Sequence, residues 1–247
     1  MLQGFYSAAS GMLMQQRHLN VVANNLANAQ TPGYKTNRLV STTFQQALLA
    51  RLEPGNSAYI GTGESTRIVD EVADIWTEGG IMETGRPFDL AITGYGFFNV
   101  QGADGTVYLT RNGQFDLDDE GFLMLPGEGR VLGANGAPIQ VTTSDINVSA
   151  TGAITNSVTG AAIGQLAITE PTEDAVVEQA RNTMYTATAT QPAGQPGIVQ
   201  GAYENSNVNL TDELTAMIIA QRNFSSASQA LQFIDATYAK AVNIAAL

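Results

Sequence analysis

Cysteine is absent from this 247-residue chain, and histidine occurs only once. Without cysteine there is no disulfide, no thiolate ligand for a metal and no cysteine nucleophile. The single histidine, His18, has no carboxylate near it in the sequence, so we expect neither a histidine-based catalytic triad nor a multi-histidine metal site. These absences exclude a cysteine nucleophile, a histidine-based triad and a thiolate or multi-histidine metal site, and we expect no bound metal or cofactor.

Basic residues and long apolar runs are also scarce. Lys and Arg total 11 against 23 Asp and Glu, which gives a formal net charge of −12 and a pI of about 4.3. Such acidity argues against nucleic acid and anionic membranes as partners. No run approaches the roughly 20 apolar residues that span a bilayer, and no apolar segment follows a basic N-terminal region. We therefore expect no membrane insertion and no cleaved signal peptide.

The two ends of the chain carry a helical pattern. Apolar residues recur at alternating spacings of three and four, which places them along one seam of a helix from about Leu2 to Asn28. Only Gln16 in this seam is polar. The N-terminal seam consists of Leu2, Phe5, Ala9, Met12, Gln16, Leu19, Ala23 and Leu26.

A second seam of the same period predicts a helix from about Thr211 to Ala245. Asn209 or Thr211 can cap its start, and Asp212 and Glu213 suit the helix dipole in its first turn. The C-terminal seam consists of Met217, Ala220, Phe224, Ala227, Leu231, Ile234, Tyr238, Ala241 and Ala245. Heptad spacing in both seams predicts that the two helices pair as a coiled coil.

The polar side of these helices is almost uncharged. Residues 1–30 contain one charged side chain, Arg17, whereas a helix that faces water usually carries many. A single apolar helix is most often buried in an ordinary domain. Two such helices, one at each terminus, favour assembly between subunits instead.

The middle of the chain reads as extended structure. Thr31-Pro32-Gly33 ends the first helix, residues 44–51 are expected to form a short helix, and residues 53–57 a loop. From Ile60 to Glu83 we expect a connector of mixed strand character. Between about Arg86 and Thr169, turn pairs such as Asn112-Gly113 and Asn135-Gly136 separate short apolar runs, which indicates antiparallel hairpins. The expected strands span residues 88–93, 97–100, 107–110, 114–117, 122–125, 131–133, 139–142, 146–149 and 164–168.

The predicted fold is therefore α+β, with paired terminal helices and an inserted, mainly antiparallel β domain. Its predicted domains are a helical coiled-coil domain of residues 1–35 plus 205–247, an extended connector of 36–85 plus 185–204, and a β-rich outer domain of 86–184.

Two groups of residues suggest chemistry. Asp116, Asp118 and Glu120 mimic the opening of a calcium loop, but the position that needs Glu is Gly127, so a solvated hairpin turn is the favoured interpretation. Carboxylate pairs here could also serve glycoside cleavage, although nothing indicates a cleft. Trp76 and Tyr95 are candidates for stacking on sugar, and packing is the more common role of such aromatics.

Three motifs, in order along nearly the whole chain, resemble signatures of the flagellar rod and hook proteins, the axial subunits of the bacterial flagellum. The first is Asn24-Asn25-Leu26-Ala27-Asn28 with Thr31, Gly33, Tyr34 and Lys35. The second is Gly94-Tyr95-Gly96-Phe97-Phe98 followed by Thr110-Arg111-Asn112-Gly113-Gln114-Phe115 and Gly121. The third is Ser206-Asn207-Val208-Asn209 with Ala220-Gln221-Arg222. Leu109 before Thr110, and Asn223-Phe224-Ser225 after Arg222, depart from the usual family pattern.

The resemblance implies a structural subunit that polymerises through its terminal helices into the basal-body rod and transmits torque from motor to hook. Its implied partners are copies of itself, other axial rod and hook subunits, and the flagellar type III export apparatus, which would place it outside the cytoplasmic membrane without cleavage. Size and the Ile60-Gly61-Thr62-Gly63 segment are most similar to distal rod subunits. A proximal rod or hook-type subunit remains the alternative.

The residues expected at the assembly interface are the large members of both seams and the amides of the Asn24–Asn28 run, which can bond backbone at a crowded helix end. They are Leu2, Phe5, Met12, Leu19, Asn24, Asn25, Leu26, Asn28, Met217, Phe224, Leu231, Ile234 and Tyr238. From another class, the rival hypothesis is a secreted β-domain carbohydrate-binding module or hydrolase.

Overall fold

The computed structural model describes residues 2–43, 47–53, 56–63, 67–181, 183–194 and 196–245, with only the course of the backbone for residues 2–4, 6, 41–70 and 241–245. The chain forms two compact units. The helical unit comprises Met1–Ala27, Asn37–Ile75 and Asn209–Leu247, and the β unit comprises Asn28–Thr36 and Trp76–Val208. The division of the chain into the three predicted domains stays a prediction.

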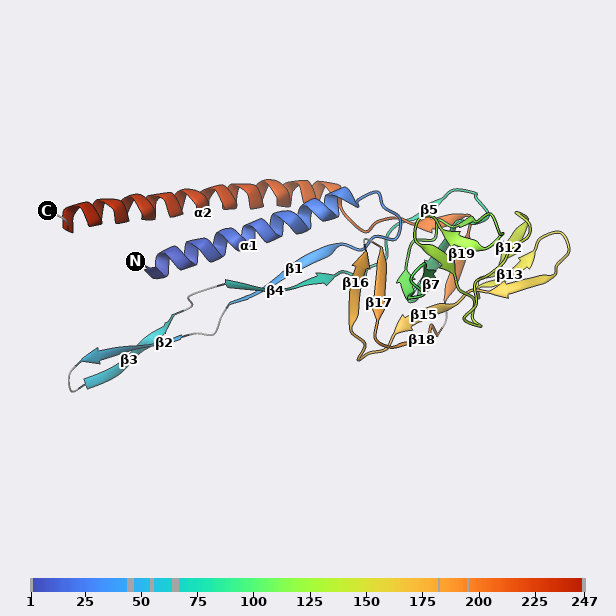
Figure 1. Ribbon diagram of the computed structural model, residues 1–247, viewed down its shortest axis with the longest axis horizontal. Coiled ribbons are helices and arrows are strands. Elements are labelled where there is room, and N and C mark those ends of the chain that lie inside the picture. The colour runs from blue at the N-terminus through green and yellow to red at the C-terminus, as the bar shows by residue number, and fades with distance from the viewer. Residues whose placement is uncertain are drawn as a thin grey trace. The chain divides into compact units, whose positions relative to one another are not determined.

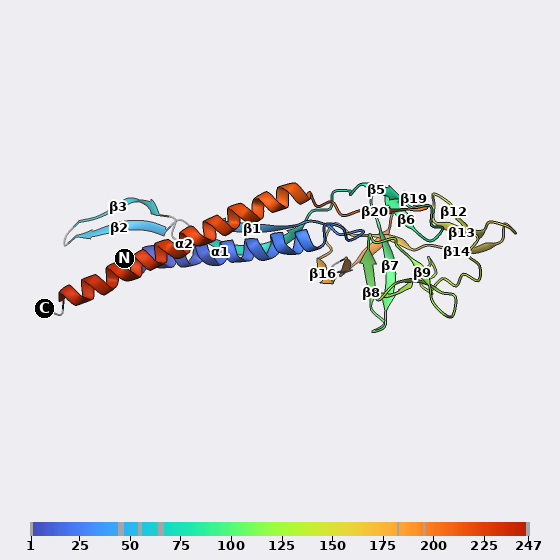
Figure 2. The ribbon, with the colours of Figure 1, turned by 90° about the horizontal axis from the view of Figure 1, so that it is seen from above.

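Both predicted terminal helices are confirmed. Helix α1 spans Leu2–Ala27 and helix α2 spans Leu210–Ala245, and the two pack against each other, as Figures 1 and 2 show in blue and red. Asn209 caps α2, since its Oδ1 accepts a hydrogen bond from the Thr211 N–H at 3.1 Å. That the pair forms a coiled coil stays a prediction. None of the described helices is long and apolar enough to cross a membrane.

The buried faces of the two helices can be identified from the residues whose side chains the structure describes. In α2, Ala220 is fully buried and the other predicted seam positions from Met217 to Tyr238 are half-buried. In α1 the most buried apolar side chain is Val22, and the most buried side chain of all those described is Asn25, and neither is in the predicted seam. Met12 and Leu19 flank that face half-buried. The packed face of α1 is therefore rotated by about one residue from the predicted seam, or about 100°.

A β ribbon completes the helical unit. Strands β1 (Asn37–Thr43) and β4 (Arg67–Asp74) pair antiparallel, as do β2 (Ala47–Glu53) and β3 (Asn56–Gly63). The expected short helix is wrong from residue 47 onward, and residues 44–46 lie outside the described part. Residues 47–53 contain good helix formers, but pairing with β3 along seven residue pairs overrides that weak preference.

The β unit is built from short strands around one core. A nine-stranded sheet runs in the order β16-β17-β8-β7-β11-β10-β9, with β15 paired to β7 and β18, and smaller sheets are β12-β13-β14, β19-β6 and β20-β5. The strands are β5 (Ile81–Glu83), β6 (Leu90–Thr93), β7 (Phe97–Gly102), β8 (Val107–Thr110), β9 (Asp116–Leu117), β10 (Leu123–Leu125), β11 (Gly129–Val131), β12 (Ile146–Val148), β13 (Ala153–Asn156), β14 (Ala162–Gln165), β15 (Ile168–Pro171), β16 (Val177–Arg181), β17 (Met184–Ala187), β18 (Thr190–Pro192), β19 (Gly197–Gln200) and β20 (Ala202–Glu204).

All described strand pairings are antiparallel, and most predicted strands appear with shifted ends. The strand expected at residues 139–142 is wrong, because isolated bridges are found there instead. Strands β13 and β16–β20 were not predicted. The core gathers side chains from both ends of the unit, including Phe98, Phe115, Leu123, Val131 and Ile154, all with no exposed surface.

Asp74, the last residue of β4, is partly buried. Burial raises the pKa of its carboxyl group from the ordinary 3.8 to about 6, because the charged form is disfavoured away from water. The stability associated with this group is therefore complete below pH 3.8 and is lost as the pH rises through about 6.

We expect the Asp74→Asn variant, which stays neutral, to raise the free energy of unfolding by about 1 to 2 kcal/mol at pH 8 and to change it little at pH 4. Thermal unfolding followed by the helical circular-dichroism signal measures this. The control Asp235→Asn, at an exposed position of α2, should behave alike at both pH values. An equal effect of Asp74→Asn at both pH values would contradict the assignment.

Candidate functional site

A cluster of three charged side chains is buried in the β unit. The Glu204 carboxylate accepts a hydrogen bond from Lys35 Nζ at 2.6 Å and one from Arg111 Nη1 at 3.2 Å. The exposed fractions of Lys35, Arg111 and Glu204 are 1%, 5% and 1%. Charged groups are rarely buried so fully unless they are paired, so this ion cluster fixes where the three segments meet.

Backbone groups complete the ion cluster. The Gly79 N–H donates to Glu204 Oε1 at 2.8 Å, and the Gly33 N–H donates to the Glu204 carbonyl oxygen at 2.8 Å. Arg111 Nη2 donates to the Gly94 carbonyl oxygen at 2.7 Å. One glutamate therefore joins segments that lie near residues 33, 79, 111 and 204 of the chain.

The electrostatics of the ion cluster favour a role in positioning chain segments over a role in catalysis. Burial lowers the pKa of Lys35, and the Glu204 carboxylate opposes that shift by attraction and by its hydrogen bond. Lys35 Nζ also donates to the Thr77 carbonyl oxygen at 2.8 Å. Because these groups are engaged with one another, the arrangement positions chain segments and offers no general acid or base.

Asn207 makes a second set of bonds between the same segments. Its Oδ1 accepts hydrogen bonds from both the N–H and the hydroxyl of Thr36, each at 2.7 Å. Its Nδ2 donates to the Thr77 carbonyl oxygen at 3.0 Å, and its backbone N–H donates to the Tyr34 carbonyl oxygen at 3.4 Å. The residues that precede α2 are thus fastened to those that follow α1.

In the helical unit, Asn25 links separate segments by hydrogen bonds as Asn207 does in the β unit. Its Nδ2 donates to the Asn37 carbonyl oxygen at 2.9 Å and to Glu213 Oε1 at 3.2 Å, and its Oδ1 accepts from the Asn37 N–H at 2.9 Å. Burial raises the pKa of Glu213, and the bond from Asn25 and the charge of nearby His18 oppose the shift. Asn25 bonds backbone as the sequence predicted, but within its own chain.

The other expected interface residues divide by exposure. Asn28 is buried and Asn24 is exposed, Phe5 is 42% exposed, and the side chain of Leu2 lies outside the described part. The half-buried ones are Met12, Leu19, Leu26, Met217, Phe224, Leu231, Ile234 and Tyr238. Their role between subunits is untested by the isolated chain.

A second apolar face of α2 was not predicted as a separate feature. Ile218 is 54% exposed and Phe233 73% exposed. Ile218 lies two residues before the buried Ala220, about 200° around the helix, and so points away from the packed face. We call this exposed face the outer face of α2, and its residues are Leu210, Leu214, Ile218, Ile219 and Phe233.

The residues suspected of binding calcium form a hairpin turn. Asp118 Oδ1 accepts the N–H groups of Glu120 and Phe122 at 3.0 and 2.7 Å, and Arg130 bonds Asp118 Oδ2 at 2.7 Å. A cationic side chain therefore occupies the place of a metal ion, and the favoured turn interpretation is confirmed. Among the described residues, no group of three or more acidic or histidine side chains is arranged to hold a metal.

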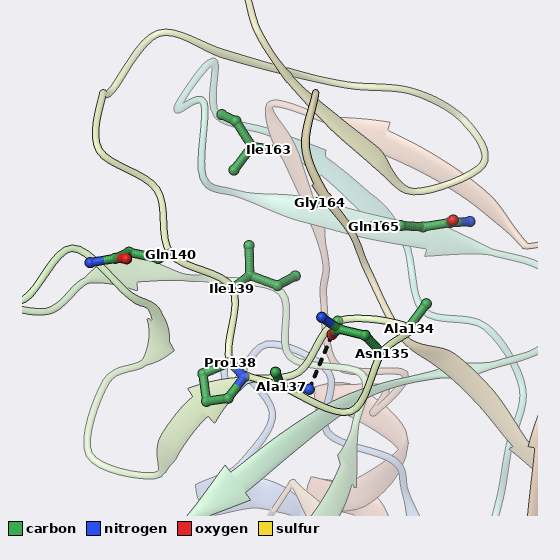
Figure 3. Close-up of a pocket in the computed structure, with 10 residues that line it drawn as sticks. Ala134, Asn135, Ala137, Pro138, Ile139, Gln140, Ile163, Gly164 and Gln165 are labelled. Carbon is green, nitrogen blue, oxygen red and sulfur yellow. Dashed lines mark hydrogen bonds between the residues drawn. The ribbon is translucent and has the colours of Figure 1, made fainter. Parts of the chain in front are cut away.

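A hollow of about 480 Å³ lies among residues 133–140 and 163–165, shown in Figure 3. Every side chain that lines it is uncharged. Asn135 Oδ1 already accepts a hydrogen bond from the Ala137 N–H at 3.1 Å. In the figure, the side chains of Gln140 and Gln165 point to opposite sides. This hollow therefore brings no reactive groups together.

Comparison with known families matches three stretches of the chain. Residues 5–35 match the model described as flagella basal body rod protein, residues 91–156 the flagellar hook protein FlgE/F/G D1 domain, and residues 199–244 the flagellar basal body rod FlgEFG protein C-terminal region. Each stretch contributes one member of the ion cluster: Lys35, Arg111 and Glu204.

Three similar proteins extend the comparison over nearly the whole chain. The flagellar basal-body rod protein FlgG of Bacillus subtilis (strain 168) is 35% identical, with 99% of both chains covered. FlgG of Agrobacterium fabrum is 33% identical, with 92% of this chain and 94% of that protein covered. The flagellar basal-body rod protein FlgF of Caulobacter vibrioides is 32% identical, with coverage of 91% and 90%.

The sequence analysis missed the ion cluster as a site. Lys35 and Arg111 stood inside quoted motifs, but Glu204 did not, and 169 residues separate it from Lys35. The only available signal was that each of two motifs in an acidic chain contains one basic residue, Lys35 or Arg111. Nothing in local spacing reports a partner that far away.

We expect Glu204→Gln to lower the free energy of unfolding of the β unit by about 3 to 5 kcal/mol, because it leaves two buried cations without their carboxylate. Urea unfolding followed by the fluorescence of Trp76, the single tryptophan, measures this. The control Glu120→Gln removes an exposed ion pair with Arg130 and should cost less than about 1 kcal/mol. Equal losses in the two variants would refute the role given to Glu204.

Gly33 offers a second test, because it has a φ of +70° and a Cβ there would lie 2.3 Å from the Asn112 nitrogen. Gly136 has a similar φ of +75° with open space around it. Both Ala variants carry a backbone cost of about 1 to 2 kcal/mol. We expect Gly33→Ala to lose about 1 to 3 kcal/mol more in urea unfolding, since the close contact must be relieved. A Gly136→Ala loss as large as that of Gly33→Ala would contradict the close packing.

Proposed function

Because this chain belongs to the family of flagellar basal-body rod and hook proteins, we propose that it is an axial subunit that polymerises through its terminal helices to form the basal-body rod. The family consists of structural components of the flagellum, so the chain is a structural protein and not an enzyme. The polymer would serve as the drive shaft that transmits torque from the motor to the hook.

The observation that carries this proposal is the outer face of α2. Full burial of one large apolar side chain contributes about 1.5 to 3 kcal/mol. The exposed side chains of this face would gain that free energy if another subunit covered them. Between Leu214 and Ile234 the helix carries a single charge, Arg222. A face that is apolar and almost uncharged is suited to a neighbouring helix.

A second contact surface per subunit is what a rod requires. The packed faces of α1 and α2 are used within the chain, and the outer face of α2, with Leu13 of α1, is left for other subunits. Contacts between different surfaces of identical subunits extend without closing and give helical polymers. The seam residues predicted at the assembly interface act in this proposal together with the outer face.

Within the family we propose the distal rod. Chain length and the Ile60–Gly63 segment support this choice. The alternatives are a proximal rod or a hook-type subunit, and relatives named FlgG and FlgF are both similar to this chain.

The partners in this proposal are copies of the chain and other axial rod and hook subunits. We further propose delivery by the flagellar type III export apparatus without cleavage, to a final place in the basal body outside the cytoplasmic membrane. The rival hypothesis of a secreted hydrolase or carbohydrate-binding module receives no support from the family matches.

We expect Ile218→Glu to prevent polymerisation while the monomer keeps its helical circular-dichroism spectrum, because a charge would enter the contact between subunits. Sedimentation and electron microscopy of concentrated protein measure polymer formation. The deletion of residues 1–27 should also abolish polymers and leave the urea unfolding of the β unit unchanged.

The matched control is Val158→Glu, which adds the same charge at an exposed apolar position of the β unit. It should polymerise at a concentration within about twofold of the unaltered chain, since Val158 is not part of either terminal helix. Polymers of normal length from Ile218→Glu would rule out the outer face as the assembly surface.

A further inference from the structure

A hollow of about 320 Å³ in the β unit brings together the two aromatic residues that the sequence singled out. Trp76 and Tyr95 both line it, together with Arg111, Glu170 and Thr172. The remaining lining residues are Lys35, Gly96, Phe97, Pro171, Ala175 and Val177. This volume lies near the lower end of the range for small-molecule sites and suits a ligand of about one ring.

The aromatic side chains are held differently. Trp76 packs edge-on against Phe97 and Tyr185, with ring centroids 5.3 and 4.7 Å apart, and remains 39% exposed. The favoured packing role of Trp76 is thus observed, but it leaves part of the indole at the hollow. Tyr95 is 84% exposed, between two glycines of positive φ, and its ring has no such support. The pair therefore offers one fixed and one adaptable aromatic surface.

Polar groups at the same hollow are suited to hydroxyl groups. Arg111 is buried, and its Nε has no hydrogen-bond acceptor in the described part of the chain, although its other nitrogens are bonded. Glu170 Oε1 accepts a hydrogen bond from Gln191 Nε2. The Glu170 carboxylate is negatively charged, whereas Arg111 is positively charged. A donor and an acceptor of opposite charge favour a neutral ligand with hydroxyl groups over an ion.

We propose that this hollow binds one neutral pyranose ring. Such a ring carries its hydroxyl groups around its edge and presents apolar C–H groups on both faces. The faces match Trp76 and Tyr95, whose rings combine an apolar surface with a polar group. The hydroxyl edge matches Arg111 and Glu170. This site is independent of polymerisation through the helices.

The single tryptophan makes the test specific, because all tryptophan fluorescence comes from this hollow. The unaltered full chain, kept dilute enough to sediment as a monomer, is titrated with methyl β-glucoside and, in parallel, with the acyclic polyol sorbitol. We expect a saturable change with the glucoside, half-complete on the order of 1 to 10 mM, and none with sorbitol.

Variants identify the residues. Tyr95→Ala should weaken glucoside binding at least tenfold, while Tyr95→Phe, which keeps the ring, should bind within about twofold of the unaltered chain. Val158→Ala, at an exposed position that does not line the hollow, is the matched control and should bind normally. Tyr95 is exposed, so these variants are expected to fold.

Three results would overturn the proposal: no saturable change with the glucoside, an equal change with sorbitol, or unaltered binding by Tyr95→Ala. If the glucoside has no effect and Tyr95→Ala fails to polymerise, the hollow is a contact between subunits and the sugar site is refuted. Failure of the unaltered chain to polymerise would count only against the proposed rod function, because binding is measured on the monomer.

Discussion

The β unit depends on one buried carboxylate. Glu204 lies between Lys35 and Arg111, and its own backbone carbonyl oxygen accepts the Gly33 N–H, so segments far apart in the sequence meet at one residue. Moving charges out of water costs free energy, and the pairing of each charge with one of opposite sign offsets that cost. The nine residues 28–36 belong to the β unit for this reason, although only a turn separates them from α1.

The helical unit follows a different constraint. Its helices carry more apolar surface than two paired helices can bury, since α2 is apolar on the packed face and on the outer face. Hydrogen bonds from Asn25 to Asn37 and Glu213 fix the register where α1 ends and α2 begins. Apolar surface is non-directional, so it supplies free energy for association, whereas the amide bonds supply geometry.

The sequence predicted those features that local chemistry determines. The seams and caps identified both helices. Asn135-Gly136 located a tight antiparallel turn, closed by the bridge between Leu132 and Pro138, whereas Asn112-Gly113 connects β8 to β9, which do not pair with each other. Strand β2 was missed because its residues prefer helix and only the partner strand decides otherwise. Among the later strands, β18 is fully exposed and β16 has polar residues at three of its five positions. Strands β17, β19 and β20 are only three or four residues long, which is too short for a clear alternation. The partner of Lys35 lies 169 residues away, and pairings at that distance leave no local pattern.

A joint built from ions differs from one built from apolar side chains in the motions it allows. Apolar groups of equal volume would hold the same segments about as strongly, but they tolerate small rotations at little cost. Hydrogen bonds to charged groups weaken steeply when distance or angle changes, and the two oxygens of Glu204 are used by different partners. The segments at residues 33–36 and 204–207 are therefore restrained in direction as well as in distance. For a subunit proposed to carry torque, resistance to rotation at the places where the chain enters and leaves the β unit is the property that matters, and the ion cluster supplies it.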